Sequence, residues 1–310
     1  MNTDPVPAPR TDLSGKVALV TGSSRGLGAA VARRIGAAGA DVIVTYRRHA
    51  DAAAAVAAEV RRSGVRCDVV ELDMGSVDSI DAVFDTVAAD VGHLDVLVAN
   101  AAATSFRNLM DAEARHVERT FAISVTGFLH AVQRAVPLME AGGGGRVVAV
   151  SGADTEVWIP AHGILAAAKS AMETLVRYLQ CELGERGVTV VGVNPGWIDG
   201  ESLQMMLGPL YERAAGLERL THPMRRTCSP DDMAEAVTLL CTDAAAWFGG
   251  NTIVADGAGG FAFCGRYSMM AGAMPQATVD VLLGTEPGSG TSTEPTLADG
   301  EAPSVPRLGG

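Results

Sequence analysis

The stretch KVALVTGSSRGLG, residues 16–28, decides the fold of this chain. Residues Val17–Val20 form a short apolar run, which is typical of a parallel strand buried on both faces. Three glycines follow in the spacing T-G-x-x-x-G-x-G, which differs from the G-x-G-x-x-G fingerprint, and residues 29–38 then favour a helix. Such a strand, turn and helix form a phosphate cradle. Glycines let the backbone approach a pyrophosphate, and free N–H groups at the helix start point at its charge.

Apolar strands and helical segments alternate along the rest of the chain. The predicted strands are 17–20, 41–46, 67–72, 94–99, 146–150, 188–193 and 252–255. The predicted helices are about 29–38, 51–62, 77–91, 112–140, 162–186, 201–220 and 231–241. This alternation is typical of an α/β doubly wound parallel sheet, the Rossmann fold, here with about seven strands and helices on both faces.

The length favours one α/β domain with extensions. A chain of 310 residues exceeds the usual domain size, but α/β folds of about 250 residues commonly form one domain. We predict a disordered arm over 1–12, the Rossmann domain over 13–264 and a largely disordered extension over 265–310. The end of that extension is rich in Gly, Ser, Thr, Pro and Glu, which cannot build a packed core.

The net charge and the cysteine pattern indicate which partners the protein could bind and which cellular compartment it occupies. The formal net charge of −12 argues against nucleic acid or an anionic membrane surface as a partner, since both need a basic face. The N-terminus lacks the apolar core of a signal peptide, and no apolar run approaches the length of a membrane span. Five cysteines are scattered without C-x-x-C spacing. These features predict a cytoplasmic protein with reduced thiols.

Two arginines predict which nicotinamide cofactor the chain binds. An NAD site usually carries an acidic residue after the second strand, where it holds the ribose 2′-hydroxyl. Here the strand 41–46 is followed by Arg47 and Arg48, which would suit a 2′-phosphate, with Arg25 as a third contact. The sequence therefore predicts NADP(H). The alternative is that both arginines only solvate the end of a strand.

Several motifs, taken in order, resemble the short-chain dehydrogenase/reductase superfamily. They are TGSSRGLG at 21–28, Asp73 at a strand end, NAAA at 100–103, Lys169 in a long helix and NPGWID at 194–199. The resemblance covers about residues 13–260 and implies that the glycine turn holds the pyrophosphate and the adjacent ribose. The implied cofactor-binding residues are Gly22, Ser24, Arg25, Gly26, Leu27, Gly28, Tyr46, Arg47, Arg48, Asp73 and Met74 (at the adenine), Asn100, Ala101 and Ala102 (at the ribose), Lys169, Gly196 and Ile198 (at the nicotinamide amide).

The chain departs from this family at the catalytic positions. The usual Y-x-x-x-K spacing, counted back from Lys169, places Leu165 where the proton-donating tyrosine stands. The usual serine falls on Gly152, next to Ser151, and the usual asparagine falls on Ser124. Because leucine and glycine offer no hydroxyl, an ordinary ketoreductase is disfavoured.

A better resemblance is to the enoyl-thioester reductase branch, whose spacing is Y-x-x-x-x-x-x-K. That spacing places His162 at the tyrosine position, and a residue seven places before Lys169 lies two helical turns away on the same face. Conjugate reduction puts negative charge on the thioester oxygen, and an imidazole N–H can donate a hydrogen bond to it. We therefore name Lys169, His162, Ser151 and Ser124 as candidate catalytic residues. The alternative for His162 is a side chain that faces water at a helix start.

Two functions from different classes remain open at this point. The first is an NADPH-dependent reductase of an enoyl thioester, acting on an acyl-CoA or a carrier-bound chain. The second is a non-redox or impaired member, such as an isomerase, cyclase or partner subunit, that still binds NADP(H). The resemblance also implies a homo-tetramer or dimer that assembles through the helices near 112–140 and 162–186.

A few other side chains carry weaker expectations. Trp158 and Trp197 could wall an apolar pocket. Asp154 and Glu156 lie in a loop over the predicted site and are expected to be solvated at the surface, with contact to the substrate as the alternative. A helical segment that follows the sixth strand is expected to form a lid; its candidate residues are Met205, Met206 and Tyr211. The remaining histidines show no metal-ligand spacing and are expected on the surface or in loops: His49, His93, His116, His130 and His222.

Overall fold

The computed structural model describes residues 11–103 and 106–262. These residues belong to one compact unit, Met1–Gly265. The predicted extension over 265–310, the thiol of Cys264 and most of the predicted N-terminal arm lie outside the described residues.

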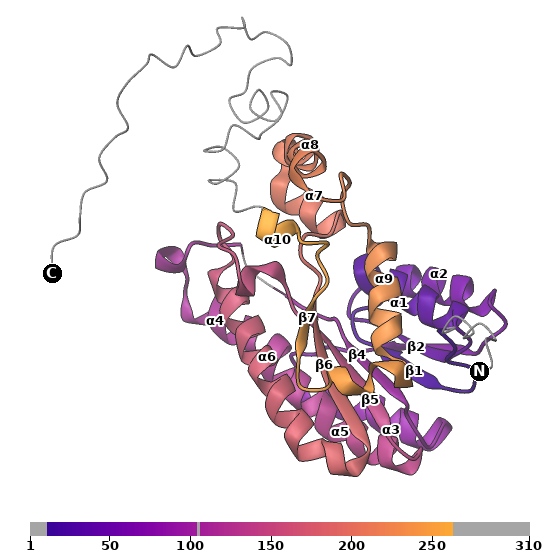
Figure 1. Cartoon of the computed structure of the whole chain (residues 1–310). Helices are drawn as coiled ribbons and strands as arrows, with labels where there is room; N and C mark the ends of the chain where they lie inside the picture. The colour runs from indigo at the N-terminus through magenta and orange to yellow at the C-terminus, as the bar shows by residue number, and fades with distance from the viewer. Residues whose placement is uncertain (1–10, 104–105, 263–310) are drawn as a thin grey trace, which may run out of the picture. The chain divides into compact units, whose positions relative to one another are not determined.

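Seven parallel strands form one sheet in the order β3-β2-β1-β4-β5-β6-β7 (Figure 1). Their bounds are β1 Val17–Val20, β2 Asp41–Tyr46, β3 Cys67–Glu71, β4 Val96–Ala99, β5 Gly145–Val150, β6 Val188–Asn194 and β7 Thr252–Val254. β1 pairs with β2 on one side and with β4 on the other, so the strand order reverses beside β1. This is the predicted doubly wound fold, and the prediction is confirmed.

Helices cover both faces of the sheet (Figure 1). α1 (Gly26–Ala37), α2 (Ala50–Arg61) and α9 (Pro230–Leu240) pack on one face. α3 (Val77–Asp90), α5 (Gly127–Ala141) and α6 (Gly163–Leu183) pack on the other. Strand β1 is apolar throughout because it faces both layers, and its four residues are all buried.

The predicted helix over 112–140 is not one regular helix. It consists of α4 (Ala114–Phe121), a π-helical turn (Ala122–Thr126) and α5. A side chain at Gly127, just after the π turn, would collide with the carbonyl oxygen of Met74, so glycine permits this close approach.

The predicted helix over 201–220 is also broken. α7 (Glu201–Leu207) and α8 (Tyr211–Thr221) are separated by a short 3₁₀ turn. Gly208 has a φ of +50°, outside the helical region, and Pro209 follows it. A further short helix, α10 (Gly259–Ala262), follows the last strand, so the predicted helix at 231–241 is not the final one.

Candidate active site

The glycine turn between β1 and α1 has the backbone geometry of an anion cradle. Gly22 and Gly26 have φ values of +65° and +57°, which are strained for any other residue. A Cβ on Gly28 would lie 2.5 Å from Nδ2 of Asn100 and closer still to the carbonyl oxygen of Gly22. Arg25 occupies the N-cap of α1 and makes no side-chain cap, so the first N–H groups of this helix are open to a bound anion.

Side chains from neighbouring strands hold this turn in place. The Asn100 amide donates to the carbonyl oxygens of Thr21 (3.0 Å) and Gly22 (3.2 Å). The Thr45 hydroxyl accepts from the Gly22 N–H at 2.9 Å. Thr21 in turn accepts from the Ala101 N–H at 2.9 Å. Sequence reasoning missed Thr21 and Thr45, although both hydroxyls stand at strand ends beside the glycine motif.

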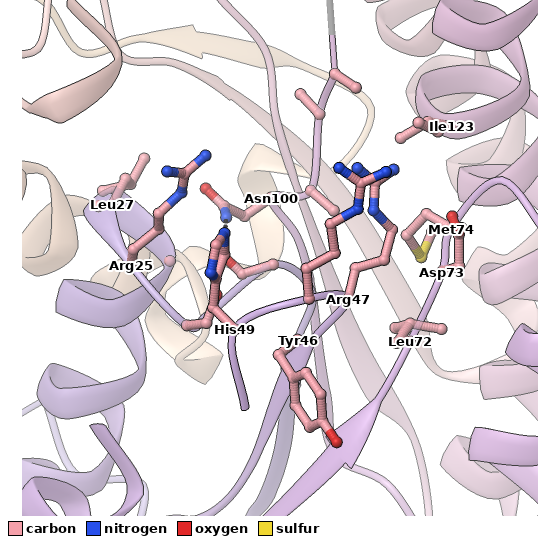
Figure 2. A pocket seen from close by; sticks show the side chains of 18 of the residues that line it. Arg25, Leu27, Tyr46, Arg47, His49, Leu72, Asp73, Met74, Asn100 and Ile123 are labelled. Atoms are coloured by element: carbon pink, nitrogen blue, oxygen red, sulfur yellow. Dashed lines mark hydrogen bonds between the residues drawn. The ribbon is translucent and has the colours of Figure 1, made fainter. Parts of the chain in front are cut away.

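A cavity of about 330 Å³ lies over this turn at the carboxyl ends of the strands (Figure 2). It brings together these predicted cofactor residues: Gly22, Ser24, Arg25, Gly26, Leu27, Gly28, Tyr46, Arg47, Arg48, Asp73, Met74, Asn100, Ala101 and Ala102. It also includes residues that the sequence analysis did not assign to the cofactor site: His49, Leu72, Ala103, Ile123 and Glu201. Lys169, Gly196 and Ile198 are not among its lining residues.

The charge around this cavity suits a phosphorylated ribose. Figure 2 shows Arg25 on one side of the cavity and Arg47, with Asp73 and Met74, on the other. Within the described part of the chain, Arg25, Arg47 and Arg48 form no salt bridge, so their charges are not neutralised by a carboxylate. Unpaired guanidinium groups are favourable partners for a 2′-phosphate. The glycine cradle and these arginines therefore fit NADP(H).

Lys169 is buried on α6, and only 4% of its surface is exposed. Its ammonium donates a hydrogen bond to the carbonyl oxygen of Val150, at the end of β5. Burial lowers the pKa of Lys169 to about 8, while Asp154 and Glu173 act in the opposite direction. The candidate lysine is thus held at the end of a strand, and its ammonium loses its proton at a lower pH than an ordinary lysine.

The two candidate serines differ in their hydrogen bonding. The Ser151 hydroxyl donates to the Glu173 carboxylate, so its proton is already used. Ser124 lies in the π turn, and its buried hydroxyl has no hydrogen-bond partner among the described residues. Ser124 is therefore the serine with a free buried hydroxyl.

His162 occupies the N-cap of α6, two turns before Lys169. Its Nδ1 lies 3.0 Å from the carbonyl oxygen of Pro160. Because a carbonyl only accepts, Nδ1 carries a hydrogen, and Nε2 is the remaining nitrogen. The ring of Phe106 lies 5.1 Å from the imidazole, centroid to centroid. The side chain is thus oriented by a hydrogen bond and a ring contact.

Asp154 does not lie on the surface as predicted. It sits in a 3₁₀ turn (Ala153–Thr155) after β5, and its Oδ1 lies 2.5 Å from the point where a Cβ on Gly152 would stand. Its Oδ2 is buried and has no hydrogen-bond partner among the described residues. Burial raises the pKa of Asp154, against the attraction of the His162 and Lys169 charges. The absence of a side chain at residue 152 leaves room for the Asp154 carboxylate in this position.

A second cavity of about 160 Å³ is lined by residues from the segments in and after β5, β6 and β7, including both predicted tryptophans. The other large apolar residues that line it are Val157, Ile159, Pro160 and Val254. His222, expected on the surface or in a loop, lies in the loop after α8, where it lines this cavity and is only 6% exposed. Its ring is satisfied on both sides: one nitrogen donates to the Asp256 carbonyl oxygen at 2.9 Å, and the other accepts from the Met224 N–H at 3.0 Å.

A hydrogen bond from Tyr211 fixes the segment that is predicted to form a lid. The Tyr211 hydroxyl donates to the Asp199 carboxylate, which also accepts from the Thr227 hydroxyl at 2.9 Å. Met205 is exposed on α7. Tyr211 is therefore an anchor of this segment.

Thiols and metal ligands add little to the site. Cys67, Cys181, Cys228 and Cys241 are free thiols. Over residues 11–103 and 106–262, no group of three or more His, Cys, Asp or Glu side chains could hold a metal ion. In the same ranges, no helix is both long and apolar enough to cross a membrane.

Comparison with known proteins places the chain in a family. Residues 22–261 match the family model described as Enoyl-(Acyl carrier protein) reductase. The chain belongs to the short-chain dehydrogenase/reductase superfamily of oxidoreductases, in the group that this model defines.

Three relatives illustrate the similarity. The 1-cyclohexenylcarbonyl-CoA reductase of Streptomyces collinus is 35% identical over 244 residues, which are 78% of this chain and 86% of that protein. The angucycline C-6 ketoreductase LanV, solved with bound NADP, is 32% identical with a TM-score of 0.72 and covers 79% of this chain and 96% of its own. The L-sorbose reductase of Gluconobacter frateurii, solved with NADPH and L-sorbose, is 26% identical with a TM-score of 0.73, over 80% of this chain and 98% of its own.

Proposed function

We propose that this protein is an NADPH-dependent reductase that saturates the carbon–carbon double bond of an enoyl thioester, on an acyl-CoA or a carrier-bound chain. The observation that carries the proposal is the pair formed by His162 and Lys169. His162 stands at the start of α6 with an oriented imidazole, and Lys169 lies two turns further along the same helix. Leu165, at the donor position of ketoreductases, has no proton to give.

NADP(H) is the cofactor of the site. The glycine turn would hold its pyrophosphate, and Arg47 and Arg48 its 2′-phosphate. The family resemblance implies that the backbone near Ile198 would hold its amide. When bound, it supplies the hydride that reduces the substrate double bond at the β-carbon, and it is itself oxidised. The addition of one proton to the α-carbon then completes the reduction of the double bond.

The residues of α6 would stabilise the charge that forms during this reaction. As the β-carbon gains hydrogen, the π-electron pair moves toward the thioester oxygen, which becomes negative. An imidazolium Nε2–H of His162 can donate to that oxygen, since Nδ1 is engaged with Pro160. A preoriented donor away from water contributes about 3–4 kcal/mol to such a step. The Lys169 ammonium adds positive charge from the same helix.

The second cavity would receive the acyl group. Trp158 and Trp197 line it together with aliphatic side chains, and its volume of about 160 Å³ suits a compact apolar chain or ring. The name of the Streptomyces collinus relative, a reductase of a cyclohexenyl thioester, supports a substrate of this kind.

The test is a spectrophotometric assay of NADPH consumption with a panel of enoyl-CoA thioesters and a matched panel of ketones. We expect consumption with enoyl thioesters only, and roughly a hundredfold loss of kcat in His162→Ala. His162→Tyr, which restores the hydroxyl typical of this branch, should retain activity. Turnover of ketones alone would overturn the proposal. Tight NADPH binding without turnover of any thioester would instead favour the non-redox alternative.

We also propose that the chain assembles as a homo-tetramer or dimer through α4–α5 and α6. The outer face of α6 carries small residues, and one of them, Ala167, is exposed. Tyr178, further along the same helix, is 65% exposed. Small side chains allow two helices to approach closely. Light scattering that gives a monomer mass at working concentration would reject this assembly.

A further inference from the structure

The hydrogen bonds of Lys169 leave its charge incompletely balanced. An ammonium has three N–H donors, and the described residues provide one neutral acceptor, the carbonyl oxygen of Val150. The side chain is only 4% exposed, so water contributes little. A buried charge is costly unless an opposite charge compensates it. The ammonium therefore needs a carboxylate close by.

Two carboxylates act on Lys169, and they are not equivalent. Glu173 lies one turn further along α6, but its Oε1 accepts the Ser151 hydroxyl. Asp154 comes from the 3₁₀ turn that packs against α6, and its buried Oδ2 has no partner among the described residues. Besides Lys169, the charged groups that act on Asp154 are His162, at the start of α6, and Glu173, which raises the pKa of Asp154. Asp154 is thus the carboxylate free to compensate the lysine.

The backbone at residue 152 makes this arrangement possible. Gly152 has an extended conformation that any residue can adopt, so no backbone strain requires glycine here. The requirement is space: a Cβ would stand 2.5 Å from Oδ1 of Asp154, closer than real Cβ contacts. A side chain at residue 152 would therefore have to displace the Asp154 carboxylate, which lies at the end of a flexible side chain.

We propose that Asp154 is a positioning residue of the active site, whose carboxylate is the counter-charge that keeps the buried Lys169 ammonium protonated. The catalytic part of this inference rests on the proposed reductase function, in which the ammonium faces the developing oxyanion. The electrostatic part does not depend on turnover. Glu173 shares the task to a smaller extent, because Ser151 occupies one of its oxygens.

The chain offers a direct test, because Lys16 and Lys169 are its only lysines. The full-length protein labelled with ¹³C-lysine should give two Cε resonances, and Lys16→Arg assigns them. The Lys169 resonance should titrate with a pKa of about 8. Asp154→Asn should lower that midpoint by about 0.5 unit or more, the size expected for a charge pair several ångströms apart even in a water-like dielectric. Glu156→Gln, an exposed carboxylate in the same loop, should leave it unchanged.

Two further variants protect the test against misfolding of Asp154→Asn. Gly152→Ser should displace the carboxylate and lower the Lys169 midpoint in the same direction. Asp154→Glu, which keeps the charge, should restore a midpoint nearer to the wild type. An unchanged midpoint in both Asp154→Asn and Gly152→Ser, with both proteins folded, would overturn the proposal. Equal shifts in Asp154→Asn and Glu156→Gln would also overturn it, because the effect would then be only general charge.

Kinetics separate this inference from the proposed function. If the protein reduces enoyl thioesters, Asp154→Asn should move the alkaline fall of kcat to lower pH while the KM for NADPH stays the same. If no thioester is reduced, the proposed function fails, but the ¹³C titration still decides the role of Asp154. If thioesters are reduced and the Lys169 midpoint does not move, only the role of Asp154 fails.

Discussion

Replacing Gly28 with alanine should damage the cofactor cradle more than any other single methyl group added to it. The new Cβ would stand 2.5 Å from Nδ2 of Asn100 and still closer to the Gly22 carbonyl oxygen. Neither atom can retreat easily, because the Asn100 amide donates to the carbonyl oxygens of Thr21 and Gly22. The change therefore overpacks a buried hydrogen-bonded junction, which typically costs about 1–3 kcal/mol.

A helical glycine elsewhere in the chain provides the control. Gly216 lies in α8, and a Cβ there would meet nothing within 4 Å. Gly216→Ala should therefore stabilise the protein slightly, by about 0.5–1 kcal/mol, because alanine is the better helix former. Both variants add one methyl group to a helix, so the comparison isolates the clash at the cradle.

The assay combines thermal unfolding with titration of NADPH followed by nicotinamide fluorescence. A loss of about 1–3 kcal/mol corresponds to a decrease in Tm of roughly 2–12 °C for a domain of this size. Because the displaced Gly22 carbonyl belongs to the anion-binding turn, we expect the Kd for NADPH to rise by about tenfold or more. If Gly28→Ala matched Gly216→Ala in Tm and in Kd, the reasoning on the cradle would be refuted.

Four further outcomes are expected from individual side chains. The double substitution of Arg47 and Arg48 by alanine should weaken NADPH by about ten- to a hundredfold and leave NADH nearly unaffected, as judged by parallel titrations. The pKa of Lys169 is lowered to about 8 by burial, so activity that needs its proton should decline above that pH in a rate profile. Because the pKa of Lys169 is lower in the folded protein, the unfolded chain binds more protons between pH 8 and pH 10.5. The contribution of Lys169 to the free energy of unfolding therefore rises over that range. Lys169→Met should remove that rise in denaturant titrations. Ser229 caps α9 and accepts from the Asp232 N–H at 3.1 Å, so Ser229→Ala should cost about 1 kcal/mol in urea unfolding.

Results of the opposite kind would be equally informative. Equal losses for NADPH and NADH in the arginine variant would mean that the two side chains only solvate a strand end. A rate profile that stays flat through pH 8–10 would exclude the Lys169 ammonium as a needed charge, since the predicted decline lies within that range.

The sequence alone was enough to predict the sheet and the cofactor cradle. Strand β1 is apolar at every position and is followed at once by glycines and a helix, so the pattern is contained in one short segment. The position of the arginines after β2 beside this cradle could be predicted for the same reason, since parallel strands end at one edge of a sheet. The regular alternation of apolar strands with helical segments was sufficient to predict the seven strands.

Tertiary structure decided which side chains meet. Asp154 was expected on the surface because the identity of an aspartate does not reveal that Gly152, two residues earlier, leaves room for it. His222 was expected in a loop, yet it is buried because the Asp256 carbonyl oxygen, 34 positions away, accepts its hydrogen bond. The breaks in the predicted helices at the π turn and at Gly208 likewise depend on packing and local backbone geometry.

Local pattern therefore determined the elements of this protein and the site of its cofactor, because hydrophobic periodicity and glycine spacing act over a few neighbouring residues. The balance of charge around Lys169 was decided only by the folded structure. Burial and electrostatic attraction depend on distances between β5, the turn after it and α6, and no periodic pattern in the sequence encodes those distances.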